Sequence, residues 1–213
     1  MKKRKNWKKL NEEFYGDEAF MINPEDIIEN KIFSLLNLEE KNLQKCQFTN
    51  VVFEKCLFLK SNLQQVQFND CKLKNCNLSL IQLKKCRFNN VIFEECKLVG
   101  INFFECDSFL FQVSFQKCLL QTCNFSFMKM KQTSFNSSTL REVDFKNTDL
   151  SDANFSECDL EGSLFHQCNL SKANFKNAKN YFIDLTNNDV KKAQFSFPEV
   201  LNLLKAFDIN ILN

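Results

Sequence analysis

The chain has 213 residues, with 28 Lys and Arg against 26 Asp and Glu and a net charge of +2 at neutral pH. This balance argues against a strongly basic nucleic-acid-binding protein and against a uniformly acidic one. No run of 18 apolar residues occurs, so no membrane-spanning helix is expected. The basic start, residues 1–14, lacks the apolar stretch of a secretory signal. We therefore expect a cytoplasmic protein that does not associate with a membrane.

Residues 1–36 are predicted to form an N-terminal arm and cap. Residues 1–22 are highly charged, with Lys and Arg gathered around Trp7. Asn23 followed by Pro24 is typical of a helix start, with Asn as the cap and Pro in the first turn. A short helix or an irregular cap is therefore expected before Leu38.

From Leu38 onward a Phe or Leu, once a Met, occupies every fifth position. One run ends at Phe103, and a second extends from Phe115 to Phe175. A helix has a period of 3.6 and a strand a period of 2, so neither explains this spacing. We call these residues the centres. Two positions before each centre from Phe48 onward lies a small or β-branched residue, with Met128 the one long exception, and all eleven cysteines occupy such positions.

One small and one large inward residue in every five suit a chain that turns a corner every five residues. Four sides then make a coil of twenty, and successive coils stack as parallel strands about 4.8 Å apart. We predict such a solenoid over residues 37–195. Cys56, Cys76 and Cys96 would stand in one column, but Cβ atoms about 4.8 Å apart exceed the ~3.8 Å of a disulfide, so free thiols are expected.

The pattern of a small residue, Asp or Asn, and then Leu or Phe recurs in DANFS at 152–156 and in CDLEG at 158–162. It resembles the pentapeptide-repeat family. That resemblance implies an all-β fold, a right-handed quadrilateral parallel β-helix. The best-known binders of this family, the Qnr and MfpA proteins, imitate DNA and protect the type II topoisomerases DNA gyrase and topoisomerase IV from quinolones.

The five-residue rule breaks between Cys106 and Val113, where two extra residues occur. The centre there is Ser108, Phe109 or Leu110, and we expect a bulge. Phenylalanines around the break are interpreted as an exposed apolar patch that either contacts a partner or packs on itself or on the N-terminal segment. The patch consists of Phe104, Phe109, Phe111 and Phe127.

Residues 142–161 carry seven acids against Lys146 alone. They are either ordinary solvated charges or a partner-binding acidic patch, and some precede a centre, where Asp favours local backbone hydrogen bonds. The resemblance implies that such a patch would face the DNA-binding surface of a topoisomerase. The seven acids are Glu142, Asp144, Asp149, Asp152, Glu157, Asp159 and Glu161.

Residues 196–213 are predicted to form a helix followed by a short strand at 209–212. Ser196 and Glu199 have the spacing of a capping box. Apolar residues then lie on two sides of the helix, and one side suffices to cover the end of the solenoid. The second side either belongs to a simple monomer cap or forms a homodimer interface. The residues expected in that interface are Leu201, Leu204, Phe207, Ile209, Ile211 and Leu212.

No catalytic residue, metal or cofactor is expected. The one histidine, His166, follows a centre and therefore faces outward, without a nucleophile beside it. No metal or phosphate-loop signature occurs. We expect a protein that is not an enzyme and that takes neither a small-molecule substrate nor nucleic acid directly. Two functions remain: docking on a type II topoisomerase through the acids, or a scaffold that binds another partner through the phenylalanines.

Overall fold

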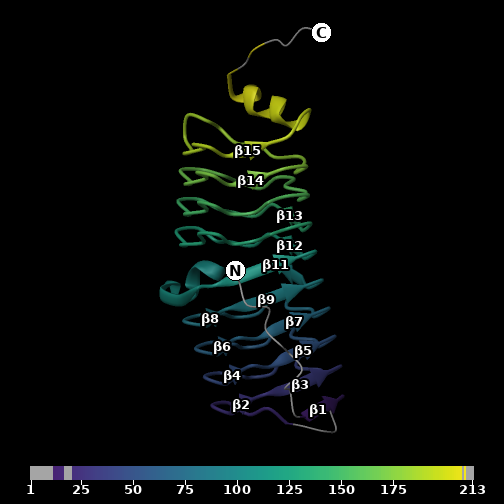
Figure 1. Ribbon diagram of the computed structural model, residues 1–213. Coiled ribbons are helices and arrows are strands. Elements are labelled where there is room, and N and C mark those ends of the chain that lie inside the picture. The colour runs from purple at the N-terminus through teal and green to yellow at the C-terminus, as the bar shows by residue number, and fades with distance from the viewer. Residues whose placement is uncertain (1–11, 17–20, 208, 210–213) are drawn as a thin grey trace.

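The computed structural model describes residues 12–16, 21–207 and 209. They form a four-sided parallel β-helix of about nine turns, which confirms the predicted fold class. Figure 1 shows the coils stacked into a rod whose C-terminal end is covered by a helix. Within the described residues no helix is long and apolar enough to cross a membrane.

Short strands lie along the sides of the rod, and each pairs in parallel with the equivalent strand one coil away. In chain order, side 1 carries β2-β4-β6-β8, side 2 β1-β3-β5-β7-β9-β11 and, farther up, β14-β15, and side 3 β10-β12-β13. Side 4 has isolated bridges such as Asn42 with Asn62. The strands are β1 (Glu12–Tyr15), β2 (Ile27–Glu29), β3 (Lys31–Ser34), β4 (Gln47–Thr49), β5 (Val52–Glu54), β6 (Gln67–Asn69), β7 (Lys72–Lys74), β8 (Arg87–Asn89), β9 (Val91–Glu94), β10 (Lys97–Val99), β11 (Val113–Gln116), β12 (Leu119–Gln121), β13 (Thr139–Arg141), β14 (Asn174–Phe175) and β15 (Gln194–Phe195).

The corners are made by the residue two positions after each centre except Phe103, and this residue adopts a left-handed backbone conformation. Lys45, Gln65 and Lys85 form one column of corners, with φ of 61°, 61° and 60°. A left-handed residue other than glycine costs about 1–2 kcal/mol. Hydrogen bonds to the next coil offset this cost: the Lys45 amide donates to the Gln64 carbonyl at 3.0 Å. The fold therefore needs few glycines.

The centres fill the axis of the rod as stacked aromatic columns. Rings of Phe135, Phe155 and Phe175 lie 4.9 Å apart at each step. Phe155 also meets Phe145 and Phe165 of the adjoining column edge-on, both at 5.8 Å. Such aromatic pairs contribute about 0.5–1.5 kcal/mol beyond the burial of their surface.

The small inward residues are hydrogen-bond donors as well as fillers. All eleven cysteines are free and buried, as predicted. The Cys158 thiol donates to the carbonyl of Phe135, a centre one coil below, at 2.9 Å. Thr148 donates in the same way to Phe125 at 2.8 Å. Cys, Ser and Thr share this position because each is a small hydrogen-bond donor. An interpretation of cysteine as a small hydrophobic residue does not account for this hydrogen bond.

The N-terminal boundary predicted at residue 36 is wrong, because the β-helix begins earlier. The Asn23–Asp26 stretch forms a turn rather than the expected helix start. Ile28 and Phe33 are buried and continue the five-residue spacing of Leu38 backwards along the chain. β1 then pairs with β3, so it belongs to the same side of the rod as the strands above it.

The C-terminal helix differs in detail from the prediction. It is a 3-10 helix, η4 (Glu199–Phe207), whose Leu203 is buried. The predicted capping box is wrong: the Ser196 hydroxyl accepts a hydrogen bond from the Asn177 amide at 2.7 Å. Ser196 therefore ties the cap to the coil below it. Of the predicted strand at 209–212, only Ile209 lies within the described residues.

The two extra residues are accommodated within one coil. Two short 3-10 helices, η2 (Phe103–Glu105) and η3 (Ser108–Leu110), lie there, and this segment projects from the side of the rod in Figure 1. Val91 pairs with Val113, a step of 22, and the step returns to 20 at Ser114 with Ser134. The insertion therefore leaves the register of the upper coils intact.

Candidate functional site

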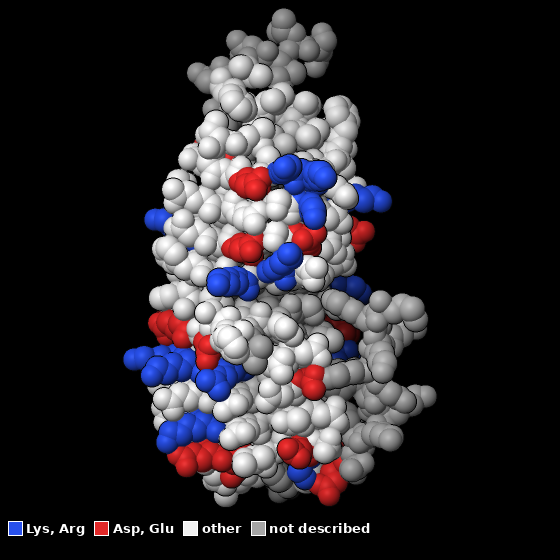
Figure 2. All heavy atoms as spheres, turned by 60° about the vertical axis from the view of Figure 1, so that its left-hand side comes forward, with Lys and Arg blue, Asp and Glu red and all other residues white. Residues whose placement is uncertain are grey.

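The predicted acidic patch is spread around the rod. Asp144 bridges to Asn124 on side 4, Asp149 to Lys129 on side 1, and Asp159 to Thr139 on side 3. Asp149 and Asp159 therefore lie on opposite sides. Figure 2 shows acidic and basic side chains interspersed on the surface that it draws. The interpretation of all seven acids as one surface is wrong, because twenty consecutive residues make one full turn of the coil.

Four of these acids do lie together. Glu142 forms the corner between sides 3 and 4, and its amide donates to the Glu161 carbonyl at 3.0 Å. Asp144 begins side 4 next to it, and Asp159 lies on side 3 two residues before Glu161. We call Glu142, Asp144, Asp159 and Glu161 the acidic edge. Asp149, Asp152 and Glu157 lie on the other sides and their corners.

Most acids at 142–161 already have a partner within the chain. Asp144 accepts from the Lys146 amide at 2.8 Å, and Asp149 from the Ser151 amide at 3.0 Å. These local bonds were expected for acids that precede a centre. A carboxylate has about four lone-pair sites, so one such bond leaves acceptor capacity facing solvent. The distances for the others are 3.9 Å for Asp152 with Lys131, 3.6 Å for Glu161 with Arg141, 2.7 Å for Glu157 with the Ser137 hydroxyl, and 2.8 Å for Asp159 with the Asn180 amide.

The predicted phenylalanine patch loses one member. Phe111 is 5% exposed, and its ring packs on Phe88 at 5.8 Å and on Phe103 at 6.0 Å. Phe111 therefore fills the core position for which the sequence suggested Ser108, Phe109 or Leu110, so none of these three is the centre. The reason is that η3 carries residues 108–110 outward, so the chain re-enters the core at Phe111.

The other three phenylalanines are exposed around one corner. Phe104, Phe109 and Phe127 are 47%, 86% and 69% exposed. Phe103 stacks on Phe125 at 4.5 Å, so these two centres lie in successive coils. Phe104 and Phe127 follow them closely in the chain and therefore flank the same corner. Phe109 lies on η3, which begins the next side; its amide donates to the Asp107 carboxylate at 3.0 Å.

The C-terminal cap exposes several apolar side chains. Leu201, Phe207 and Ile209 are exposed, and Leu204 is half-buried. Phe197, which the sequence analysis did not include, is also exposed. Ile211 and Leu212, the remaining predicted interface residues, lie outside the described residues.

Most of the thiols have little reactivity in this setting, and the exception is Cys56, whose pKa is lowered by a hydrogen bond with Cys76. Burial raises the pKa of Cys123 and of Cys158 to about 12, which keeps both protonated at neutral pH. No group of three or more potential metal ligands occurs in the part of the chain that the structure describes. His166 is exposed, as its place after a centre predicted.

The described part of the rod has at least two hollows. One, of 540 Å³, lies where Lys45, Gln65 and Lys85 adjoin the inserted segment. The other, of 350 Å³, lies between the last coil and η4, beside the acidic edge. It is lined by Glu161, Asn180, Tyr181, Phe182, Glu199 and Asn202.

Comparison with known families identifies the repeat. The model of the pentapeptide repeat region matches residues 46–109, 67–145 and 108–175, which together span 46–175. The chain belongs to the pentapeptide-repeat family.

Solved structures of pentapeptide-repeat proteins show the same fold. A trypsin-treated variant of QnrB1, a plasmid-mediated fluoroquinolone resistance protein, aligns with a TM-score of 0.56 at 17% identity, covering 94% of this chain and 96% of that chain. A second trypsin-treated QnrB1 variant aligns with a TM-score of 0.50 at 16% identity, covering 94% and 98%. A search of curated proteins found no match.

One part of this pentapeptide-repeat protein escaped the sequence analysis, the hollow under the cap. Its signal was a missing centre: five residues after Phe175 stands Asn180, a polar residue. Asn180 turns the corner with φ of 58°, and Tyr181 enters the core in its place. A centre position filled by Asn marks a coil that departs from the repeat.

Proposed function

We propose that this chain is a non-enzymatic binding protein that docks on a type II topoisomerase, DNA gyrase or topoisomerase IV, in the cytoplasm. Docking would modulate the enzyme or protect it from quinolone-type inhibitors. The observation that carries the proposal is the match to a QnrB1 variant over nearly the whole of both chains.

The charge of the chain outside residues 2–9 supports partial DNA mimicry. Residues 2–9 contribute six of the 28 basic residues and no acid, leaving 22 Lys and Arg against 26 Asp and Glu in the rest of the chain. Apart from that segment the chain is therefore acidic, with a net charge of −4. The acidic edge is the part of the predicted patch that can meet one flat surface, and salt should weaken its contact.

A supercoiling assay tests the docking proposal. Purified protein is titrated at low salt into DNA gyrase, and supercoiling and quinolone-stabilised cleavage are measured. Protection or inhibition at micromolar protein supports the proposal. No effect on either gyrase or topoisomerase IV contradicts it.

Matched variants locate the contact. One neutralises the acidic edge with Glu142→Gln, Asp144→Asn, Asp159→Asn and Glu161→Gln. The control neutralises the other three acids with Asp149→Asn, Asp152→Asn and Glu157→Gln. Asn keeps the side-chain oxygen that accepts the local amide, so the fold is expected to survive. The edge variant should lose activity at the enzyme, and the control should retain most of it.

The exposed phenylalanines favour a second candidate, a scaffold for a different protein. Phe104, Phe109 and Phe127 are exposed around one corner, whereas exposed aromatic residues that need no explanation are scattered singly. Phe104→Ser, Phe109→Ser and Phe127→Asn would abolish such an interaction, with Asn chosen because Phe127 has φ of 63°. No effect of the unaltered protein on either topoisomerase, together with binding of another protein that this variant loses and the edge variant keeps, would favour the scaffold.

A homodimer through the cap is part of the proposal. Leu201, Phe207 and Ile209 present apolar surface at the end of the rod, where a second copy would cover it. Sedimentation should show a dimer at concentrations on the order of tens of micromolar, and Leu201→Asp should dissociate it. A monomer at those concentrations contradicts this part.

A further inference from the structure

Two cysteines differ from the other nine in their hydrogen bonding. Nine of the eleven thiols donate to a backbone carbonyl, as Cys158 does to Phe135. The thiols of Cys86 and Cys106 donate no such bond within the described residues, although these cysteines are only 0% and 7% exposed. Buried polar groups normally have a partner, so this pair calls for an explanation.

The two thiols belong to the same corner of successive coils. Gln67 pairs with Arg87 on side 1, and the Asp107 amide donates to the Cys86 carbonyl at 2.9 Å. Cys106 therefore stands directly above Cys86 in the column of small inward residues. Their Cβ atoms are about one coil spacing apart, ~4.8 Å, which exceeds the ~3.8 Å of a disulfide.

A third sulfur follows in the same column. Met128 is the long exception among the small inward residues, and it is 2% exposed. Phe103 stacks on Phe125 at 4.5 Å, so the step between these two coils is 22 residues. The same step leads from Cys106 to Met128. Two thiols and a thioether therefore succeed one another in three consecutive coils.

The ladder of backbone hydrogen bonds is interrupted at this column. Elsewhere the residue after an inward position donates to the coil below, as the Asp149 amide does to the Met128 carbonyl at 3.0 Å. The equivalent bond, from the Lys129 amide to the Cys106 carbonyl, is not formed within the described residues, because the insertion starts here. The coils can part more easily at this point, which gives a small ion a path to the sulfurs.

Cations flank the pair. Lys85 and Arg87 adjoin Cys86 in the chain, and both line the hollow of 540 Å³ whose wall includes Cys106. Arg87 pairs with Asp107 at 2.8 Å, whereas Lys85 takes part in no ion pair among the described residues. Lys85 can therefore offset part of the negative charge of a metal ion bound by two thiolates.

Both thiols carry their protons in the metal-free chain. Burial, and then the neighbouring Cys106, raise the pKa of Cys86. Burial, and then the charges of Glu105 and Asp107, raise the pKa of Cys106. A thiol that binds a metal ion is deprotonated, so each bond from a cysteine to the metal would release one proton to solvent. Hard cations such as Mg²⁺ prefer oxygen ligands, so a soft ion is required.

We propose that Cys86, Cys106 and Met128 bind one soft monovalent metal ion, of the class of Cu(I). Thiolate and thioether sulfurs select this class. A metal–thiolate bond is about 2.3 Å long, so an ion midway between two thiolates spans about 4.6 Å, close to the ~4.8 Å between coils. No third Cys, His, Asp or Glu joins the pair in the part of the chain that the structure describes, which disfavours a tetrahedral zinc site.

This site does not depend on docking to a topoisomerase. A bound ion would connect the coils where the ladder is interrupted, and it would hold Cys106 next to Asp107, the residue that caps η3. Metal binding and supercoiling are measured separately, so failure of one proposal leaves the other standing.

An anaerobic titration of the reduced, full-length protein with Cu(I) tests the site. Competition with a chromophoric Cu(I) chelator should show one tightly bound ion per chain, with ultraviolet charge-transfer absorption and release of protons. In protein labelled at the methionine methyl carbons, one equivalent of Cu(I) should shift the Met128 signal. The signal of Met130, a buried centre two residues farther on, should move much less.

Variants separate this column from the other thiols. Cys106→Ser keeps a small polar residue of the kind found elsewhere at this position and should weaken the tight binding about a hundredfold or more. Met128→Leu keeps most of the volume and should weaken it about tenfold. The matched control, Cys76→Ser with Cys96→Ser, alters two stacked thiols that do donate to carbonyls, and it should leave the tight site unchanged.

Three outcomes would overturn the proposal. These are the absence of a tight ion in the titration, an unmoved Met128 signal at one equivalent of Cu(I), and equal losses of affinity in Cys106→Ser and in the control variant. The methyl signals of the unaltered protein and the Met128→Leu variant decide the matter even where Cys106→Ser fails to fold.

Discussion

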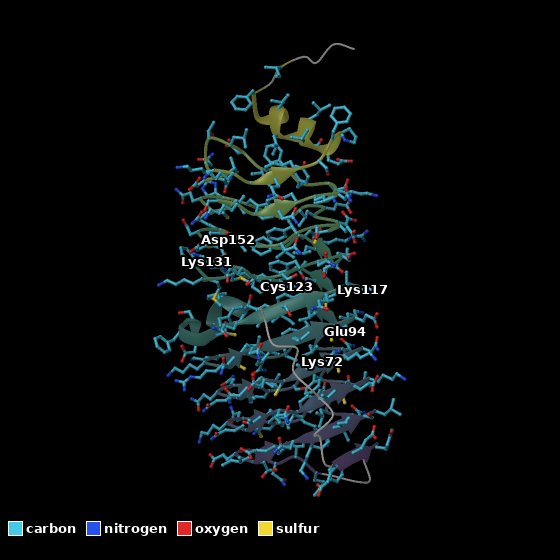
Figure 3. The ribbon with its side chains drawn as sticks, viewed as in Figure 1. Lys72, Glu94, Lys117, Cys123, Lys131 and Asp152 are labelled. Carbon is cyan, nitrogen blue, oxygen red and sulfur yellow. The ribbon has the colours of Figure 1, made fainter. Side chains whose placement is uncertain are left out.

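Below the insertion, in residues 27–99, charged side chains form close ion pairs between neighbouring coils, whereas above it, in residues 113–195, the acids bind backbone amides and uncharged side chains, or lie farther from their basic partners. Lys72 lies 2.6 Å from Glu94, and Lys60 lies 3.0 Å from Glu40. Above the insertion, Lys131 and Asp152 are 3.9 Å apart; Figure 3 labels this pair and the Lys72–Glu94 pair. Residues 27–99 pair several of their charges one coil away but keep a basic surplus, with 11 Lys and Arg against 7 Asp and Glu. The acids of the upper region keep carboxylate acceptor capacity that faces solvent.

The cores of the two regions differ in composition but not in design. Below the insertion the small inward position is mostly cysteine or valine, and above it Ser, Thr and Ala are more frequent. In both regions the aromatic centres stack from coil to coil, as Phe33 with Phe53 at 5.4 Å and Phe155 with Phe175 at 4.9 Å. The repeat therefore constrains size and hydrogen-bonding capacity rather than residue identity.

Alkaline pH should have the largest effect, and it should affect the cysteine-rich lower coils first. Burial raises the pKa of Cys46, in the lower coils, to about 11 in the folded chain, whereas an unfolded thiol ionises near ~8.5. The folded form holds the proton more tightly, so its advantage is complete below pH ~8.5 and falls as the pH rises toward 11. At pH ~11 each such thiol would cost about 3 kcal/mol of unfolding free energy.

Urea unfolding at increasing pH, with thiolate absorbance and limited proteolysis, checks this prediction. Apart from that of Cys56, whose pKa is lowered by a hydrogen bond with Cys76, thiolate absorbance should appear only together with unfolding, and cleavage should begin below the insertion. More than one thiolate per chain near pH 9 in protein that remains folded would contradict the buried-thiol explanation.

Removing one ring from the stack should be costly in either region. Phe53 and Phe155 are both fully buried, and truncation of a buried Phe to Ala costs about 3–5 kcal/mol. We expect Phe53→Ala and Phe155→Ala to fall in this range when measured by urea denaturation. A difference of several kcal/mol between them would show that the two regions do not share one packing design.

Removing an inward hydroxyl should have a moderate effect. Ser61 donates to the Leu38 carbonyl at 2.9 Å below the insertion, and Thr148 donates to the Phe125 carbonyl at 2.8 Å above it. Ser61→Ala and Thr148→Val remove the donor and keep most of the volume, at a cost of about 1 kcal/mol each. Values near zero would indicate that the position needs only a small residue.

Breaking an ion pair on the surface should have the smallest effect. Lys74 lies 3.1 Å from Glu54, a closer pair than Lys131 with Asp152. Lys74→Gln should lower the urea midpoint slightly at low salt, and Lys131→Gln should hardly change it. The difference should vanish at high salt because salt screens exposed charges, and a difference that survives there would contradict it.

The fold was predictable because each side of the rod is built from the same five-residue pattern. The centre and the small donor keep a fixed spacing in every repeat, and the parallel stacking of the coils follows from that spacing. The N-terminal boundary was missed only because Ile28 and Phe33 were not counted as centres. Phe111 could not be assigned, because an insertion allows several ways of re-entering the core.

The candidate site was less predictable because distance along a solenoid is not distance in space. Glu142 and Glu161 adjoin although they are a coil apart in sequence, while Asp149 and Asp159 face opposite directions. Grouping residues by their position modulo twenty, rather than by sequence window, would have found the acidic edge. The hollow under the cap depends on η4 and on Asn180, and it lies beyond the region that the repeat specifies.

The insertion at η3 shows that a surface segment can change without a change in the stacked coils that support it. Because the coil closes again at Val113, the coils on either side remain aligned whatever is inserted between them. Segments of other lengths and compositions grafted at 108–110 would therefore be carried at a fixed height and on a fixed side. New binding surfaces can therefore arise in such a protein without changes to the buried core. The same position also suits protein design, because a peptide inserted there would have a known orientation.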